Sequence, residues 1–203
     1  MNNYLIGFCG GSGAGKTTLV SQLLNHYGNK AVAIELDSYY KDSPGLTFKE
    51  REKINFDHPD SFDIDLLKEH LILLKSGNEI KKPIYDFKTH KRQKNTNTIN
   101  PNTLIFLEGT LIFYFIELIN IINLKIFIET KESIRYQRRI DRDIKQRGRT
   151  ISNVKKQYQS TVKPMHVKYI EPLRSVAEVI ISGELDIVDS TNRVIKKIDL
   201  LTR

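Results

Sequence analysis

A short glycine-rich segment near the N-terminus has the residue types and spacing of a phosphate-binding loop. It follows the pattern Gly-x4-Gly-Lys-Thr between Gly10 and Thr17. Glycines let successive backbone N–H groups turn toward phosphate oxygens, and a helix that follows adds the positive end of its dipole. Lys16 is expected to contact the β- and γ-phosphates, and the Thr17 hydroxyl to bind Mg²⁺. The predicted nucleotide-binding residues are Gly10, Gly11, Ser12, Gly13, Ala14, Gly15, Lys16, Thr17 and Thr18.

The residues on either side of this loop predict the elements that hold it in place. Residues 4–9 are apolar enough for a buried strand, and residues 19–24 have apolar positions at helical spacing. A glycine-rich turn that binds nothing is the alternative, but such a turn requires neither a strand before it nor a helix after it. The sequence therefore predicts a site for a nucleoside triphosphate.

Two carboxylates come directly after predicted strands. Asp37 follows the strand predicted over residues 31–36, and Glu108 follows the continuous apolar run 103–107. In an open parallel sheet, ligands lie beyond the carboxyl ends of the strands. We expect Asp37 to accept a proton from an attacking hydroxyl and to organise the waters of the metal, and Glu108 to hold the water shell of Mg²⁺. The alternatives are a helix N-cap for Asp37 and a chance acidic residue at a strand end for Glu108.

Another aspartate stands in an extended or turn segment. Asp57 precedes His58-Pro59, and the proline disfavours a helical conformation at His58. An aspartate held in such a loop could accept hydrogen bonds from two ribose hydroxyls, although a turn-forming aspartate is the alternative. A helix is expected over residues 63–75, with Asp60 or Ser61 as its cap.

The next segment predicts a hairpin arm. Residues 81–87 and 96–99 read as short strands around the polar, basic loop 88–94. Tyr85, Phe87 and His90 could line a pocket for a planar base, with the rings stacking and the imidazole forming a hydrogen bond. A histidine in a loop is, by itself, more often a solvated surface residue, and a basic loop is more often a solvated face.

A predicted helix after the strand 125–129 carries many basic residues. Arg135, Arg139 and Arg142 are spaced i, i+4, i+7 and are expected to share one helix face. Such an arginine-lined segment could close over a triphosphate and stabilise charge in a transition state. A salt-bridged surface helix is the alternative.

Acidic residues and a glycine mark the end of this helix. Asp141 with Lys145, and Asp143 with Arg147, are i, i+4 pairs that would support the helix modestly. The glycine of the segment 147–149 is expected to end the helix as a hinge. Residues 153–168 are predicted to continue as helix, with an interruption at Lys163-Pro164.

Length and composition limit the class of protein. The chain has 203 residues, of which 39% are hydrophobic and 28% charged, so a single globular domain is expected and wholesale disorder is excluded. The single cysteine, Cys9, allows no internal disulfide. The apolar stretch 111–128 is interrupted by polar and charged residues, and the N-terminus has no leader pattern, so we expect a cytoplasmic protein with no membrane partner. The net charge of +8 is concentrated locally, which argues against a broad nucleic-acid face.

The order of predicted elements gives the fold class. Strand, loop and helix are followed by alternating strands and helices, and a last strand and helix are predicted over residues 177–181 and 187–201. This order predicts a three-layer α/β/α sandwich of the P-loop NTPase type, with a parallel sheet of about five strands, a small β-hairpin arm and a helical lid. We expect one domain over residues 1–203, with the arm at 80–100 and the Arg-rich lid at 135–165.

Taken together, several segments resemble the uridine kinase (uridine-cytidine kinase) family of P-loop nucleoside kinases. The phosphate loop is shared by many proteins, whereas the other segments in this order are far more specific. The segments that carry the resemblance are 10–18, Asp-Ser-Tyr-Tyr at 37–40, Asn-Phe-Asp-His-Pro at 55–59, Pro-Ile-Tyr-Asp-Phe at 83–87 with His90, Glu-Gly at 108–109, Arg-Arg at 138–139, Arg-Asp at 142–143, Arg-Gly-Arg at 147–149, Gln-Tyr at 157–158 and Val-Lys-Pro at 162–164.

The resemblance implies transfer of the γ-phosphoryl of ATP or GTP to the 5′-hydroxyl of uridine or cytidine in pyrimidine salvage. The residues it implies for catalysis are Asp37, Lys16, Arg142 and Arg147, and those for Mg²⁺ are Thr17, Asp37 and Glu108. The implied nucleoside-binding residues, with Asp57 on the ribose, are Tyr40, Phe56, Asp57, Tyr85, Phe87, His90, Arg139, Arg149 and Gln157. A homo-oligomer, commonly a tetramer in the family and often inhibited by CTP, is implied as well.

The sequence departs from the family pattern in three places. Thr17 stands where serine is usual and keeps the hydroxyl, and Thr110 stands where an apolar residue is usual. Residues 182–186 replace a Pro-Arg-Gly segment near the purine of the donor, which leaves the donor preference open. The alternatives are a phosphoribulokinase-like or pantothenate kinase-like enzyme, against which the segment 85–90 argues, and a nucleotide-dependent RNA-binding protein.

Overall fold

Five parallel strands form the centre of the molecule. The computed structural model describes residues 3–203. The strands are β1 (Tyr4–Cys9), β2 (Ala31–Glu35), β5 (Leu104–Gly109), β6 (Leu124–Glu129) and β7 (Val179–Ser182), in the order β2-β5-β1-β6-β7. Each neighbouring pair is parallel. The predicted sheet is confirmed, and β1 and β5 lie at its centre because they are apolar along nearly their whole length.

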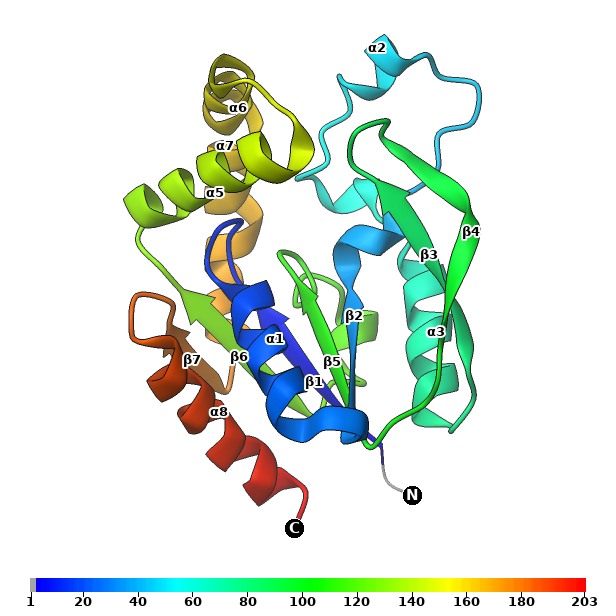
Figure 1. The fold of residues 1–203 in the computed structure, drawn as a ribbon, viewed down its shortest axis with the longest axis vertical. Coiled ribbons are helices and arrows are strands. Elements are labelled where there is room, and N and C mark those ends of the chain that lie inside the picture. The colour runs from blue at the N-terminus through cyan, green and yellow to red at the C-terminus, as the bar shows by residue number, and fades with distance from the viewer. Residues whose placement is uncertain (1–2) are drawn as a thin grey trace.

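Helices cover both faces of this sheet (Figure 1). Helices α1 (Lys16–Tyr27) and α8 (Ile187–Leu201) pack on one face, where their apolar residues join one buried cluster with alternate residues of the strands. Helices α3 (Ile64–Lys75) and α4 (Ile116–Ile119) contribute to a second cluster on the opposite face. Neighbouring residues of one strand therefore point into different clusters, which is why the strands read as continuous apolar runs.

The second strand of the hairpin arm is longer than the sequence predicts. Strands β3 (Ile80–Asp86) and β4 (Lys91–Ile99) pair antiparallel and stand beside the short helix α2 (Phe48–Arg51) (Figure 1). The basic segment predicted as a loop is largely part of β4, whose side chains are mostly exposed. Because β4 is polar on both faces, it has no apolar periodicity from which its length could be predicted.

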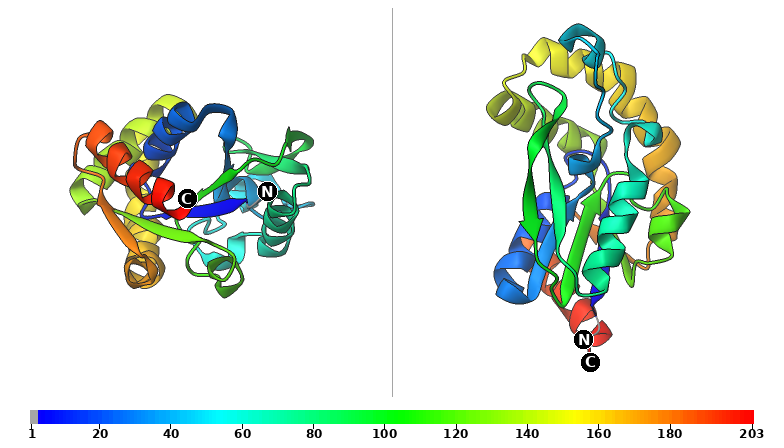
Figure 2. Two further views of the ribbon diagram at one scale, coloured as in Figure 1. Left: turned by 90° about the horizontal axis from the view of Figure 1, so that it is seen from below. Right: turned by 90° about the vertical axis from the view of Figure 1, so that its right-hand side faces the viewer.

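The lid side begins with α5 (Glu132–Arg147), which ends at Gly148 in the left-handed conformation (φ 65) as predicted. One further helical stretch follows, made of α6 (Ile151–Gln157), a π-helical turn, α7 (Lys163–Met165), and further π and 3₁₀ turns to Val176. The right-hand view in Figure 2 shows this stretch running from the top of the molecule down along the sheet. The predicted interruption at Pro164 is wrong. Pro164 has no backbone N–H to donate, but π-helical turns on either side of α7 keep the chain helical through this position.

The cap of α3 also differs from the prediction. Asp63 caps this helix by accepting a hydrogen bond from the backbone N–H of Leu66, whereas Asp60 and Ser61 lie in a preceding 3₁₀ turn. No helix within residues 3–203 combines the length and apolarity that crossing a bilayer requires.

Candidate active site

The phosphate loop joins β1 to α1 and is tightly packed from behind. Gly13 has a φ of 80°, and a Cβ there would lie 2.3 Å from the backbone oxygen of Arg135, so only glycine fits. The Lys16 ammonium is folded back on the loop and donates to the carbonyls of Gly10 (2.9 Å) and Gly11 (3.1 Å). Burial lowers the pKa of Lys16, while Glu108 and Asp37 act in the opposite direction. The loop thus has the shape and the cation that a polyphosphate needs.

A cavity of about 340 Å³ opens in front of this loop. The predicted catalytic and metal-binding residues come together in its lining, which includes Lys16, Thr17, Asp37, Glu108, Arg142 and Arg147. They come from the ends of β1, β2 and β5 and from the last turns of α5. The common edge formed by the carboxyl ends of parallel strands places them side by side.

Two of the three residues predicted to bind Mg²⁺, Thr17 and Glu108, already touch each other. Thr17 Oγ1 donates to Glu108 Oε2 at 2.9 Å. Burial raises the pKa of Glu108 to about 7, opposed by the nearby Lys16 and the Thr17 hydroxyl. A buried carboxylate beside a hydroxyl offers two of the oxygen ligands that Mg²⁺ prefers. Within residues 3–203 no cluster of three or more His, Cys, Asp or Glu side chains is arranged to hold a metal ion.

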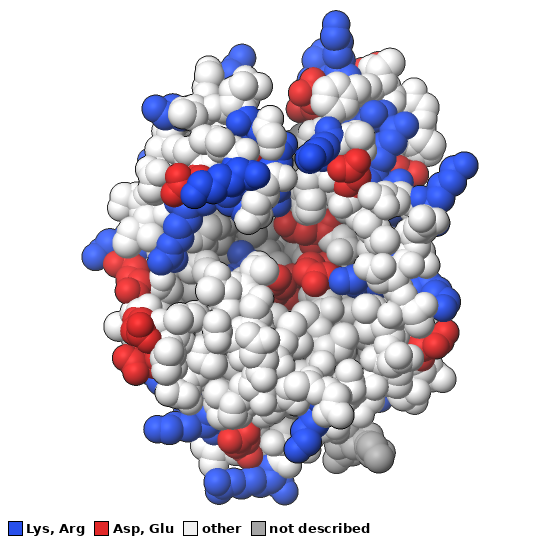
Figure 3. Space-filling view, viewed as in Figure 1, with Lys and Arg blue, Asp and Glu red and all other residues white. Residues whose placement is uncertain are grey.

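An adjoining cavity gathers all of the residues that were expected around a nucleoside. Its lining combines residues after β2, the arm, the segment before α3 and the lid. The predicted residues found in it are Tyr40, Phe56, Asp57, Tyr85, Phe87, His90, Arg139, Arg149 and Gln157, together with Asp37, Arg142 and Arg147. Figure 3 shows the hollow between lid and arm, with acidic atoms at its floor and basic side chains around its upper rim.

Aromatic rings form one wall of this cavity. The His90 ring stacks on Phe56 with centroids 4.9 Å apart and an interplanar angle of 12°, and Tyr40 lies 5.0 Å from Tyr85. His90 itself has a φ of 55°, which is uncommon for a residue with a side chain and positions the ring inward. The Tyr85 hydroxyl is buried and has no hydrogen-bond partner within the described chain. A planar ligand with polar edges would satisfy it.

The opposite wall carries a buried ionic network. Asp57 lies 3.9 Å from Nη1 of Arg139, which also donates to the Ser12 hydroxyl at 2.9 Å. Burial raises the pKa of Asp57, and Arg139 opposes this shift. Gln157 accepts hydrogen bonds from both Arg139 and Arg149. Arg139 therefore connects Ser12 of the phosphate loop, Asp57 and Gln157 of α6.

The sequence analysis paired the acid at the centre of this network, Asp143, with Arg147 alone, and that pair is present at 3.6 Å. Asp143 is fully buried, with 0% exposure. Its carboxylate lies 2.8 Å from Arg142 and 3.5–3.6 Å from three further arginines, which are Arg139, Arg147 and Arg149. Burial alone would raise the pKa of Asp143, but the arginines hold it below its ordinary value. The sequence signal for this role is an acidic residue with arginines four positions and one position before it and four and six positions after it.

Two expectations about α5 are corrected by the contacts. Asp141 accepts a hydrogen bond from Gln137 instead of pairing with Lys145, which is a surface arrangement that spacing alone does not decide. Arg135 does not line the front cavities with Arg139 and Arg142. It lies behind the phosphate loop, because the loop packs against α5 between Arg135 and Arg139.

Comparisons with known proteins agree with this geometry. The family model described as "Phosphoribulokinase / Uridine kinase family" matches residues 5–186. The chain belongs to this family. A protein named uridine kinase from Clostridium novyi (strain NT) is 47% identical over 182 residues, covering 89% of this chain and 88% of that protein. One of the same name from Brevibacillus brevis (strain 47 / JCM 6285 / NBRC 100599) is 46% identical over 181 residues, covering 89% and 85%.

A solved structure supports the fold of this phosphoribulokinase/uridine kinase family member. The phosphoribulokinase from Rhodobacter spheroides superposes with a TM-score of 0.65 at 15% identity, covering 94% of this chain and 74% of that one. At this identity the likeness shows the fold alone. The substrates are therefore inferred from the residues that line the two cavities and not from the superposition.

Proposed function

We propose that this protein is a uridine kinase, which transfers the γ-phosphoryl group of ATP to the 5′-hydroxyl of uridine. The observation that carries the proposal is the aromatic and ionic cavity that opens directly beside Asp37 and the phosphate loop. Relatives named uridine kinase, which are 46–47% identical over most of their length, support the same activity.

The acceptor is positioned by the front cavity. Asp57 accepts hydrogen bonds from the ribose hydroxyls while Arg139 holds the carboxylate in place. The base stacks in the wall formed by Tyr40, Phe56 and His90, and its polar edge pairs with the free Tyr85 hydroxyl. Phe87, Arg149 and Gln157 complete the enclosure.

The reaction then takes place at Asp37. Its carboxylate accepts the proton of the 5′-hydroxyl as the oxygen bonds to the γ-phosphorus and the bond to the β-γ bridging oxygen breaks. Lys16, Arg142 and Arg147 stabilise the charge that develops on the transferred group and on the leaving diphosphate. Thr17 and Glu108 would hold Mg²⁺ together with phosphate oxygens, Asp37 would orient its waters, and the ion supplies charge neutralisation when bound.

The lid and the arm are proposed to close over the two substrates. We assign the arm (residues 80–100) to the nucleoside and the Arg-rich lid (residues 135–165) to the phosphates, within a single kinase domain over residues 1–203. In the structure the Arg147 guanidinium lies 4.1 Å from the centroid of the Phe87 ring, so lid and arm already touch above the cavity.

The finer properties are also proposals. Cytidine as a second acceptor, GTP as a second donor, a homotetramer, a cytoplasmic location and a role in pyrimidine salvage are consistent with the family resemblance. The donor base would lie near residues 182–187, where Gly183 accepts a hydrogen bond from Arg138 and lies against the phosphate loop.

A coupled assay of ADP release tests the proposal. The acceptor panel would contain uridine, cytidine, adenosine, thymidine, ribulose 5-phosphate and pantothenate, each with ATP and Mg²⁺. Turnover confined to uridine and cytidine is expected. Turnover of ribulose 5-phosphate or pantothenate instead, or silence with every acceptor while ATP still binds, would contradict it.

A further inference from the structure

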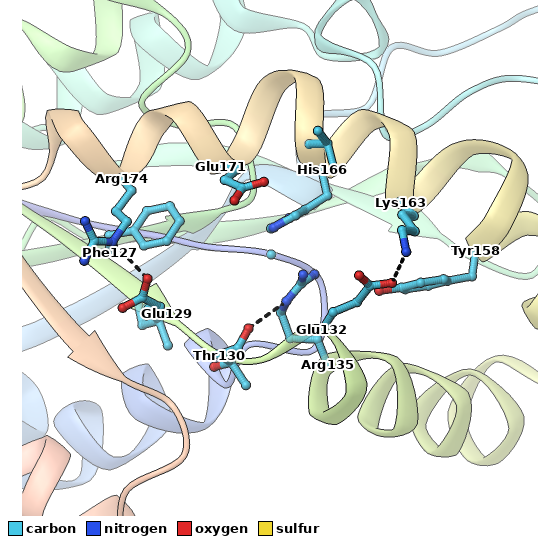
Figure 4. Close-up of a pocket in the computed structure, with 13 residues that line it drawn as sticks. Phe127, Glu129, Thr130, Glu132, Arg135, Tyr158, Lys163, His166, Glu171 and Arg174 are labelled. Carbon is cyan, nitrogen blue, oxygen red and sulfur yellow. Dashed lines mark hydrogen bonds and ion pairs between the residues drawn. The ribbon is translucent and has the colours of Figure 1, made fainter.

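A second polar cavity lies behind the phosphate loop, on the side away from Asp37. It has a volume of about 250 Å³ and lies between the end of β6, the first turn of α5 and the helical stretch after α6 (Figure 4). Its lining includes apolar side chains such as Phe127 and Val167 and several charged ones. The proposed phosphoryl transfer uses none of these side chains.

Most charges around this cavity are paired within the protein. Glu132 binds Lys163 at 2.9 Å, and Glu129 binds Arg174 at 2.9 Å. Figure 4 shows both pairs at the edges of the cavity. These four groups therefore cancel one another and do not determine the charge of an occupant.

Two charged side chains of the lining, Arg135 and Glu171, have no ion pair within residues 3–203. Glu171 is exposed to solvent, whereas Arg135 is buried. Arg135 is only 6% exposed, and its Nε donates to the Thr130 carbonyl at 3.0 Å. Its two terminal nitrogens form no hydrogen bond or ion pair with any residue of 3–203, and Figure 4 shows them directed across the cavity toward His166. A buried guanidinium without a counter-charge is unfavourable unless something else supplies the anion.

His166 provides a second unsatisfied group at the same place. Its Nδ1 is buried with no hydrogen-bond partner within the described chain. A Cβ on Gly11 would lie 2.7 Å from Arg135 Nη1 and 3.0 Å from His166 Nδ1, so both side chains converge on one point of the phosphate loop. Burial, with Arg135 and Lys16 nearby, lowers the pKa of His166 to about 4, so the ring is neutral near pH 7 and one of its nitrogens can donate.

We propose that the cavity behind the phosphate loop binds a small oxyanion, the carboxylate or phosphate group of a small molecule, between Arg135 and His166. The planar fork of the guanidinium matches two oxygens of such a group, and the imidazole supplies a further hydrogen bond. The apolar part of the lining would accept the carbon skeleton of an organic ligand. This site is separate from the γ-phosphate site, because the backbone of Gly11 stands between the two.

Nuclear magnetic resonance of the histidine rings tests this site without relying on turnover. The protein is first saturated with Mg²⁺ and a non-hydrolysable ATP analogue, so that the front of the loop is filled. Inorganic phosphate and, separately, acetate are then titrated, and the His166 signal is assigned by its absence in His166→Gln. A saturable shift of that signal is expected with at least one anion, and the preference tells a phosphate ligand from a carboxylate ligand.

Variants decide whether Arg135 is responsible. Arg135→Gln is expected to weaken binding about tenfold or more, and Arg135→Lys to weaken it less, since the charge remains but the fork is lost. Arg174→Gln is the matched control, because this arginine lines the same cavity but is already paired with Glu129. Melting curves check that each variant is folded. If Arg135→Gln does not fold, Arg135→Lys takes its place in the test.

Two results would overturn the proposal. One is the lack of any saturable His166 shift with either anion at millimolar concentration. The other is an equal shift in wild type and in the folded Arg135 variants. Neither result depends on whether the protein phosphorylates uridine, so the proposed function is tested separately.

Discussion

Arg135 and Arg139 stand one turn apart on α5, on opposite sides of the phosphate loop, and each is 6% exposed. Arg139 faces the front cavity, where Ser12, Asp57 and Asp143 all lie within 4 Å of it. Arg135 faces the rear cavity, where a single backbone carbonyl is its partner within residues 3–203. The two arginines are therefore equally buried but differ in their partners. Arg139 is held by acids of the front cavity, whereas no acid of residues 3–203 pairs with Arg135.

The largest expected effect comes from removing the base of the front cavity. Asp37→Asn should lower kcat by about 10²- to 10⁴-fold with little change in ATP affinity, because proton acceptance matters mainly in the transition state. Steady-state kinetics and ATP binding by calorimetry measure both quantities. Asp42→Asn, an exposed acid on the same connection, is the control and should behave as wild type. Near-normal turnover of Asp37→Asn would remove this residue from the mechanism.

The second largest effect tests whether the front arginines depend on one buried acid. Asp143→Asn should lower the free energy of unfolding by about 3–5 kcal/mol, because it leaves the buried Arg139 and three partly buried arginines without their shared partner. Urea denaturation measures the change. Asp141→Asn, which alters an exposed acid on the same helix, should change it by less than about 0.5 kcal/mol. Equal stability of the two variants would mean that Asp143 does not organise the lid.

The same residue predicts a pH dependence. Its pKa is held below the ordinary value in the folded protein, so its stabilising contribution is present above the pKa of the unfolded chain, about 4, and is lost as the pH falls through the folded pKa. The stability difference between wild type and Asp143→Asn should therefore be full at pH 7 and shrink below about pH 4. Denaturation curves over this range measure it, and a difference that is constant with pH would contradict the assignment.

A smaller effect is expected at the aromatic wall. His90→Ala should raise the KM for uridine about tenfold, because it removes the ring stacked on Phe56, and should change the KM for ATP by less than about twofold. His26→Ala, on the exposed side of α1, is the matched control. If both substrates were affected equally, His90 would have no specific role in base recognition.

The smallest effect is expected at the rear cavity, and it tests the contrast between Arg135 and Arg139. Arg135→Gln should change the free energy of unfolding by less than about 1 kcal/mol, because no buried acid loses its partner. Arg139→Gln should cost about 2–4 kcal/mol, because Asp57 and Asp143 lose a counter-charge. Thermal or urea denaturation of the two variants side by side measures this. A similar cost for both would mean that Arg135 is a structural residue like Arg139.

The sequence was most informative where the determinants are local. The phosphate loop lies in one contiguous segment, and α8 has the predicted bounds because its apolar period and its Asp186 cap are local features. Asp37 and Glu108 could be placed together because parallel strands end at one edge of the sheet. The parallel topology thus predicted that these two residues, which are distant in the sequence, lie at one site.

Features that depend on packing between distant segments could not be predicted in this way. Spacing alone made Asp143 a surface ion-pair partner, whereas the folding of residues 149–157 back over α5 buries it. The rear cavity requires the helix that carries His166 to return along β6, and no periodicity in α5 indicates that. The length of β4 was missed because a solvated ribbon needs no apolar alternation.

We propose that the front cavity selects a pyrimidine nucleoside as phosphoryl acceptor. One competition reaction tests it most directly. The enzyme is given ATP, Mg²⁺ and equal concentrations of uridine, ribulose 5-phosphate and pantothenate, and the products are identified by mass spectrometry. Uridine 5′-monophosphate as the sole new phosphate ester is the predicted result. Phosphorylation of either other acceptor, with uridine left unchanged, would contradict the account.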